Sequence, residues 1–209
     1  MTVKPSASAS PVTKPFKQEE KMDNQPRLKK KYLETVKPYL KDRFKYKSVM
    51  QVPKIEKIKL NVGIGEAIKD SKLLDAAVQE LTLISGQKPA ISKAKRSVSN
   101  FKLRKGMSIG AHVTLRNTMM YEFLDRLIEI SIPRIRDFQG MPTESFDGRG
   151  SYNFGIKEQT VFAEIKFDNI LRSNGLNVTI VTSAKTDEEA YELLKQVGFP
   201  FRKTKTEDN

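Results

Sequence analysis

The amino-acid sequence predicts an α+β fold, a two-layer sandwich in which a mostly antiparallel sheet carries helices on one face and the chain forms long functional loops. Apolar and polar residues alternate over 57–62 and 108–116, as in strands that bury one face, and 176–183 is a further strand. Apolar residues at helical spacing over 71–84 and 118–132 indicate amphipathic helices. Such strands and helices bury their apolar sides by packing against one another.

The first 26 residues differ in composition from the rest of this 209-residue chain. They hold four of the ten prolines, and they offer too few apolar groups to offset the entropy cost of ordering. We therefore expect a disordered extension over 1–26, a single α+β domain over 27–203 and a polar tail over 204–209. The domain begins with a helix over 28–46, which Pro38 should kink or divide.

Two strands carry the clearest alternation. Strand 57–62 turns its even-numbered residues, Ile58, Leu60 and Val62, toward the core. Strand 108–116 turns its odd-numbered residues inward, namely Ile109, Ala111, Val113 and Leu115. A short strand around 89–92 and a basic loop over 93–106 precede it.

The helices carry recognisable end signals. Asp70 or Ser71 can cap the start of helix 71–84, and Gly86 lies where a helix end favours a left-handed residue. Pro133 should stop the second core helix.

The last third of the domain begins with a glycine-rich stretch over 137–155, which we interpret as one long loop. Loops of that length in a compact domain are usually functional or ordered by a partner. A final helix over 187–197 follows strand 176–183, and Thr186 and Glu189 have the spacing of a capping box at its start.

The charge is concentrated in two blocks. The formal net charge is +13, from 38 Lys and Arg against 25 Asp and Glu. Residues 27–47 hold nine bases and two acids, and residues 81–121 hold eight bases and no acid, whereas 122–209 is mildly acidic. Because nearby carboxylates cancel the field that attracts phosphates, an acid-free run indicates a polyanionic partner, and a nucleic acid fits best.

The composition also excludes several classes of protein. With no cysteine, the chain has no disulfide, thiol nucleophile or cysteine-ligated zinc site, and with only His112 it lacks most histidine-based catalytic arrangements. No window approaches the length of an apolar membrane span. We therefore expect a non-enzymatic protein with no metal, cofactor, small-molecule substrate or membrane partner.

The glycines at 63 and 65 superficially match a dinucleotide-binding motif. Ile68 stands where the third glycine belongs, and no acidic residue follows at the distance that a ribose needs. We interpret Gly63 and Gly65 as residues that permit a tight strand-to-helix turn. An RNA-modifying or nucleotide-dependent enzyme that uses this turn is the competing hypothesis, and a general basic nucleic-acid binder is another.

The polar face of the predicted sheet is the candidate binding surface. Amides and hydroxyls can hydrogen-bond bases or 2′-hydroxyls while Lys and Arg meet phosphates, a mixture suited to structured RNA. His112 lies on the same face, where we expect it to contact nucleic acid. The candidate RNA-binding residues are Lys57, Lys59, Asn61, Gln87, Lys88, His112, Thr114 and Arg116.

Five segments resemble a known family, ribosomal protein five of the bacterial large subunit. They are SVMQVPKIEKIKLNVGIGEA (48–67), LISGQKP (83–89), AKRSVSNFKLRKGMSIGAHVTLR (94–116), IPRIRDFQGMPTESFDGRGSYNFGIKEQ (132–159) and GFPFRK (198–203). The five segments follow one another in one order, without a large gap, over about residues 28–203.

The resemblance implies a structural role in the bacterial cytoplasm, on the large ribosomal subunit. Members of the family bind 5S rRNA through the sheet face and help anchor it in the central protuberance. By position in the matching motifs, Asn61, Gln87 and Thr114 would contact that RNA. Further implied partners are the remaining large-subunit rRNA and neighbouring large-subunit proteins.

Two loops have implied roles of their own. The basic loop would approach the P-site tRNA through Lys93, Lys95, Arg96 and Lys102. The glycine-rich loop would form a bridge to a small-subunit head protein through Arg136, Asp137, Phe138, Asp147 and Arg149.

The chain departs from the family pattern at three places. Position 112 is commonly Lys or Arg in the family, residues 117–121 lack the charged residues and the Trp often found there, and the residues before 27 have no counterpart.

Overall fold

The computed structural model describes residues 25–68, 70–165 and 172–202, and the expected extension and C-terminal tail lie almost entirely outside them. Five strands form one sheet in the order β2-β3-β1-β5-β4, and every neighbouring pair is antiparallel. The strand bounds are Ile55–Gly63 (β1), Ala90–Lys93 (β2), Ser108–Leu115 (β3), Tyr152–Ile156 (β4) and Leu176–Thr182 (β5). The α+β fold class with an antiparallel sheet is therefore confirmed.

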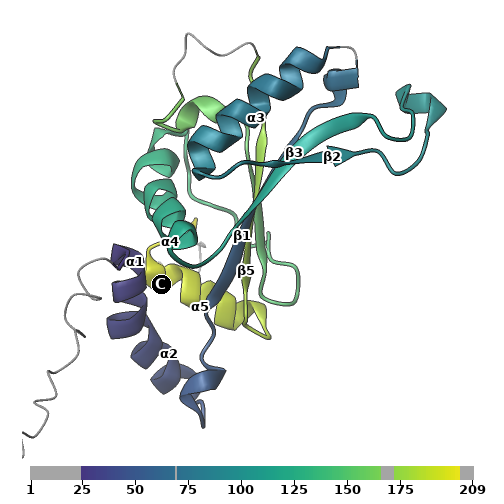
Figure 1. The fold of residues 1–209 in the computed structure, drawn as a ribbon. Helices are drawn as coiled ribbons and strands as arrows, with labels where there is room; N and C mark the ends of the chain where they lie inside the picture. The colour runs from purple at the N-terminus through teal and green to yellow at the C-terminus, as the bar shows by residue number, and fades with distance from the viewer. Residues whose placement is uncertain (1–24, 69, 166–171, 203–209) are drawn as a thin grey trace, which may run out of the picture.

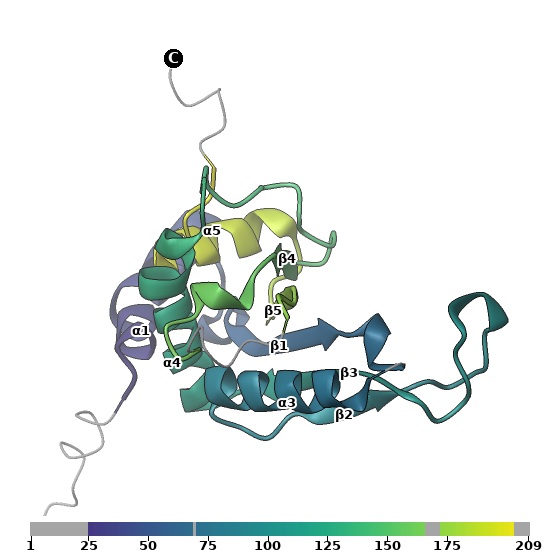
Figure 2. The ribbon, with the colours of Figure 1, turned by 90° about the horizontal axis from the view of Figure 1, so that it is seen from above.

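The helices lie on one side of the sheet. Figures 1 and 2 show α4, α5 and the helix containing α1 and α2 on one side of β1, β5 and β4, while no helix of the described residues covers the other side, which is called the uncovered face below. Among the described residues, no helix is long and apolar enough to cross a membrane. The helix bounds are Arg27–Lys31 (α1), Lys37–Phe44 (α2), Ser71–Ser85 (α3), Asn117–Arg126 (α4) and Asp187–Val197 (α5).

The strand alternation places the core as expected. Ile58 and Leu60 of β1, and Ala111 and Leu115 of β3, are fully buried on the helical side. The residues between them turn to the uncovered face, so one strand contributes both to the core and to a possible binding surface.

The predicted helix ends are also confirmed. The Asp70 carboxylate accepts a hydrogen bond from the Lys72 N–H at 2.9 Å, and Gly86 ends α3 in the left-handed conformation with φ 67°. At α5, the Thr186 hydroxyl accepts from the Glu189 N–H at 3.4 Å. The Glu189 carboxylate accepts in return from Lys185 N–H, one residue earlier than in a standard capping box.

Both prolines lie where regular α-helix is interrupted, and Pro38 marks the division between α1 and α2 that the sequence predicts. Pro38 is the second residue of α2, directly after the π-helical turn Tyr32–Val36, and the helical path continues through both. Pro133 lies in the 3-10 turn Ile132–Arg134 and is likewise preceded by a π-helical turn. A proline lacks the N–H that an α-helix needs, and the wider π turn changes the hydrogen-bond pattern just before it. The helical segment ends at Arg134, one residue after Pro133, so it stops close to where the sequence predicts.

The glycine-rich stretch contains a strand that the sequence interpretation missed. Residues 137–155 were expected to form one loop, but β4 begins at Tyr152 and pairs with β5. Tyr152, Phe154 and Ile156 are buried while Asn153 and Gly155 are exposed, which is ordinary strand alternation. The neighbouring glycines are typical of loops, and for that reason the short alternating pattern was not interpreted as a strand.

An aromatic cluster holds the remaining loop against the sheet. The Tyr152 ring lies 4.8 Å from Phe146 and 5.5 Å from Phe201, measured between centroids. The Met141 N–H donates to the Pro200 carbonyl, and the Arg202 N–H donates to the Met141 carbonyl, both at 2.9 Å. The loop therefore has a packed base formed by the C-terminal segment.

Candidate nucleic-acid interface

Two rows of polar residues cross the uncovered face of the sheet. Asn61 in β1 pairs with His112 of β3 on one side and Asn177 of β5 on the other. Lys59 pairs in the same way with Thr114 and Thr179. Directly opposed side chains in a sheet lie about 5 Å apart at Cβ, so each row is a continuous polar strip.

The structure brings most of the predicted rRNA-binding residues together. Lys59, Asn61 and His112 are exposed on this face, while Lys57 and Thr114 are half-buried. Arg116 follows β3 directly and is exposed at the start of α4.

Gln87 and Lys88 are placed differently from the prediction. They were expected at the start of the second strand, but they lie in the turn between α3 and β2, where both are exposed. Ala90 pairs with His112, so the antiparallel chain just before β2 runs in the direction of Thr114. The two residues thus border the β3 side of the face and are not part of a strand.

Several polar residues on this face were missed by sequence reasoning. Asn177 and Thr179 come from β5, and Asn153, which pairs with Thr179, comes from β4. Together with Asn61 and Gly155 they line a shallow hollow in the face. The alternation in LNVTIVT was a usable signal for Asn177 and Thr179, whereas their position beside β1 was not evident.

His112 has one partner within the protein. Its Nδ1 lies 2.9 Å from the Ser92 hydroxyl, across the β2–β3 pair. Because this contact uses Nδ1, Nε2 is the ring nitrogen that remains for an external partner.

The cations of the face are not neutralised by ion pairs with described residues, so their charge can attract phosphates. The ion pairs between described residues join Arg27, Arg43, Arg126 and Arg172 to acids, and none of them involves Lys57, Lys59 or Arg116. No carboxylate occupies the paired positions of the two polar rows. The face therefore combines unpaired positive charge with amides and hydroxyls that both donate and accept hydrogen bonds.

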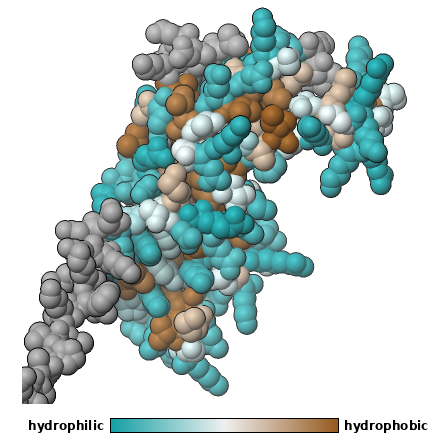
Figure 3. Space-filling view, viewed as in Figure 1, coloured by the Kyte–Doolittle hydropathy of each residue, from teal (hydrophilic) through white to brown (hydrophobic). Residues whose placement is uncertain are grey.

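The basic segment 93–106 is an ordered hairpin extension rather than an irregular loop. The Val98 and Leu103 backbones exchange hydrogen bonds at 2.9 and 3.1 Å, and the tip contains the 3-10 turn Ser99–Phe101. Figures 1 and 2 show this extension projecting from the body, and Figure 3 shows that its surface is largely hydrophilic.

The predicted basic residues of the hairpin, Lys93, Lys95, Arg96 and Lys102, are all exposed. Phe101 at the tip is 73% exposed, and sequence reasoning had assigned it no role. An exposed aromatic ring among cations offers a stacking surface as well as charge.

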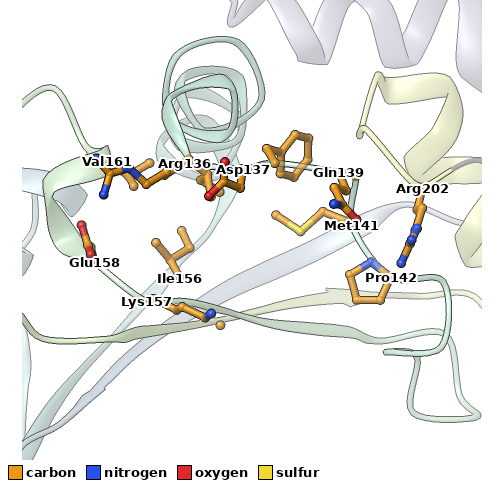
Figure 4. A pocket seen from close by; sticks show the side chains of 14 residues that line it. Arg136, Asp137, Gln139, Met141, Pro142, Ile156, Lys157, Glu158, Val161 and Arg202 are labelled. Carbon is orange, nitrogen blue, oxygen red and sulfur yellow. The ribbon is translucent and has the colours of Figure 1, made fainter.

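The predicted bridge residues fall into two groups. Arg136, Asp137 and Phe138 line a cavity of about 410 Å³ between the start of the loop and the end of β4. Figure 4 shows Asp137 and Met141 on one side of this cavity and Ile156 and Lys157 on the other.

Asp147 and Arg149 do not line that cavity. Asp147 accepts hydrogen bonds from the Arg149 and Ser151 N–H groups at 2.9 and 2.8 Å. Slight desolvation acts to raise the pKa of Asp147, but these N–H donors hold it below its ordinary value. The Asp187 carboxylate accepts from the Gly148 and Gly150 N–H groups, which ties this turn to the start of α5. The turn is thus a rigid projection.

The backbone at the glycine turn places no special demand on Gly63 or Gly65. Neither Gly63 nor Gly65 has a positive φ, and a β-carbon at either position would meet no atom within 4 Å. The chain turns here from β1 into the 3-10 turn Gly65–Ile68, which Gly63 and Gly65 permit, but its backbone does not require glycine at either position. Among the described residues there is also no group of three His, Asp or Glu side chains that could hold a metal ion.

Comparison with known proteins identifies the family. The family model of ribosomal protein L5 matches residues 48–104, and the model of the ribosomal L5P family C-terminus matches residues 108–201. Large ribosomal subunit protein uL5 of Lactobacillus acidophilus is 62% identical over 174 residues, which cover 83% of this chain and 97% of that protein. The uL5 proteins of Chlorobaculum tepidum and Streptococcus sanguinis are 58% and 57% identical, and each comparison covers 85% of this chain and at least 97% of the relative. The chain therefore belongs to the ribosomal protein L5 family.

Proposed function

We propose that this protein binds 5S rRNA through the uncovered face of its sheet and so helps to anchor that RNA in the central protuberance. As a member of its family it is a structural, non-enzymatic constituent of the large ribosomal subunit. The finer proposal is carried by one observation, the two polar rows centred on Lys59 and Asn61, which no helix covers and no carboxylate interrupts. We place it on the ribosomes of a bacterial cytoplasm.

The chemistry of the rows fits a folded RNA. Amide and hydroxyl groups of Asn61, Thr114 and Gln87 can pair with base edges or 2′-hydroxyls in a wide, shallow minor groove. Lys57, Lys59 and Arg116 can neutralise phosphates around that contact. The two rows contain no aromatic residue, so single-stranded bases have no stacking platform there.

Binding of 5S rRNA should be specific as well as electrostatic. In a titration at fixed salt, we expect the full-length protein to bind 5S rRNA at least about 100-fold more tightly than unrelated folded RNAs of equal length. Electrophoretic mobility shift with labelled RNAs measures this ratio. Equal affinities for all RNAs would instead support a general basic nucleic-acid binder, whose affinity falls steeply with salt.

The projecting hairpin is the proposed contact with the P-site tRNA. Its length, its exposed cations and its distance from the sheet face support a separate target from 5S rRNA. The anchored turn at Asp147 and the cavity beside Phe138 are the proposed bridge to a small-subunit head protein. Their support is that hydrogen bonds to Asp187 hold the turn against the start of α5 and that the cavity is lined by the end of β4.

Ribosomes reconstituted with two variants separate these roles. Replacing Lys95, Arg96 and Lys102 by Gln should reduce P-site tRNA retention without changing subunit association, because the cations are lost only at the hairpin. Replacing Phe138 and Arg149 by Ala should weaken subunit association by several-fold and leave tRNA retention near normal. Filter binding of tRNA and sucrose-gradient profiles are the measurements, and wild-type values in both would contradict the two assignments.

A further inference from the structure

His112 is the only histidine in the sequence, and it lies on the uncovered face that the proposed function assigns to RNA. Histidine is the side chain that ordinarily changes its charge between about pH 5 and 8, whereas lysine and arginine keep theirs. Among the residues of the two polar rows, His112 is therefore the one that can present RNA with either a neutral ring or a cation.

The ring is held by a contact that is compatible with both charge states. Its Nδ1 lies 2.9 Å from the Ser92 hydroxyl on β2. The residues beside this contact are small, because Gly110 lies opposite Ser92 and Ala90 lies opposite the ring. A hydroxyl can donate a hydrogen bond to a neutral Nδ1 or accept one from an Nδ1–H group. Ser92 can thus keep the ring in one orientation whether or not the ring is charged.

The other ring nitrogen, Nε2, is left for a partner outside the protein, since the side chain of His112 is exposed. In the protonated ring, Nε2 carries a hydrogen and part of the positive charge. It can then donate a charge-assisted hydrogen bond to a phosphate oxygen, which is about twice as strong as a bond between neutral groups. A phosphate therefore favours the protonated ring over the neutral one.

The neighbouring strands place cations near the ring. On β1 the residue opposite His112 is Asn61, and Lys59 lies in the next polar row. On the side of β2, Lys88 precedes the strand and Lys93 ends it. None of these side chains is a carboxylate that would stabilise a proton on the ring.

The acids of the elements that pack against β3 lie elsewhere or already have a partner. Glu56 lies at the opposite end of β1 from the ring. Glu66, in the 3-10 turn after β1, is paired with the arginine that opens the described segment before β5. Asp70, Asp75 and Glu80 belong to α3 and its cap, and α3 packs against β3 on the buried side. The phosphates of a bound RNA would therefore supply the negative charge that favours the protonated ring.

We infer that RNA binding to the uncovered face is linked to protonation of His112, whose ring takes up a proton when a phosphate comes to lie beside Nε2. The inference rests on the proposed function for the identity of the RNA. Linkage is reciprocal, so a proton that RNA favours also favours RNA. The affinity for RNA should therefore rise as the pH falls through the range in which the ring titrates.

The test measures binding of labelled 5S rRNA to the full-length protein at about pH 5.5 and about pH 8, in about 0.1 M salt. Two variants bracket the wild type, because H112Q is neutral at both pH values and H112K is charged at both. All three proteins share every other titratable group, including Glu80, whose pKa is raised by burial. A pH dependence that the wild type shows and H112Q lacks thus belongs to His112.

We expect the affinity of the wild type to be about five- to eightfold higher at the lower pH. One added phosphate contact releases about 0.9 of a counterion, which in about 0.1 M salt corresponds to a factor of about eight. H112Q should bind equally at both pH values and match the wild type at the higher one. H112K should also bind equally at both, but match the wild type at the lower one. The salt slope of the wild type should be steeper by about 0.9 at the lower pH.

Calorimetry supplies a second readout that needs no variant of the protein. Binding at about pH 7 in two buffers of different ionisation enthalpy gives the number of protons taken up, and we expect uptake of a fraction of a proton by the wild type. Zero uptake overturns the inference, and so does equal pH dependence in the wild type and H112Q. A failure of the proposed function gives a different result, in which 5S rRNA and an unrelated folded RNA of equal length bind equally at both pH values. A failed inference leaves the preference for 5S rRNA intact.

Discussion

Replacing Asn61, Gln87 and Thr114 together by Ala is expected to weaken 5S rRNA binding by several kcal/mol, at least about 100-fold. Each side chain removed leaves a polar group of the RNA buried without a partner, and each such loss costs ~1–3 kcal/mol. A tenfold change in affinity corresponds to about 1.4 kcal/mol, so even the lower end of the sum reaches that factor. Titration of labelled 5S rRNA by mobility shift measures it.

The fold should tolerate this triple substitution. Asn61 and Gln87 are exposed and Thr114 is half-buried, and none of their side chains makes a hydrogen bond to the described part of the protein. The thermal midpoint should therefore stay close to wild type. A matched control replaces Thr35, Gln51 and Gln79, which are exposed away from the face, by Ala. Unchanged 5S affinity in a folded triple variant would remove the sheet face from the proposal.

Replacing Gly110 by Ala is expected to destabilise the protein by about 3 kcal/mol, the upper end of the usual cost of overpacking. Gly110 lies in the middle of the sheet, opposite Gly63 of β1 and Ser92 of β2. A β-carbon there would overlap the carbonyl oxygen of Val62, which is backbone and cannot move without separating β1 from β3. Urea denaturation followed by circular dichroism measures the loss.

Gly63 supplies the control because it is the direct partner of Gly110 in the same pair of strands. A β-carbon at Gly63 meets no atom within 4 Å, and the residue has an ordinary φ. Gly63→Ala should therefore leave stability unchanged or raise it by up to about 1 kcal/mol, through the lower entropy of the unfolded chain. Equal stability of the two variants would show that the strands adjust and that Gly110 is not required for close approach.

Much of the interface could be predicted because strand alternation is local. Successive side chains of a strand point to opposite faces, so the sequence of β1 places Lys59 and Asn61 on the other face of the sheet from Ile58 and Leu60. This holds whichever elements the strand packs against. The same reasoning placed His112 and Thr114 correctly on β3. What was missed came from long-range pairing: β5 lies beside β1 although more than 110 residues separate them in the chain.

Glycine and proline were the least reliable guides. The alternation over Tyr152–Ile156 was visible, but the surrounding glycines favoured a loop. Pro38 and Pro133 correctly marked a divided helix and a helix end, but nothing in local propensity indicated the π turn that precedes each of them. The sequence drew attention to the backbone freedom of Gly63. The structure shows instead that a β-carbon has no room at Gly110, the partner of Gly63 on β3.

The sequence by itself determined the fold class, the polar and apolar sides of the main strands, the acid-free basic blocks and the absence of cysteine-based chemistry. Each of these follows from composition or from patterns within a few residues. Only the tertiary structure decided that β1 stands between β3 and β5 and that the two polar rows are continuous. Those facts depend on contacts between distant segments, which cooperative packing selects and local sequence does not encode.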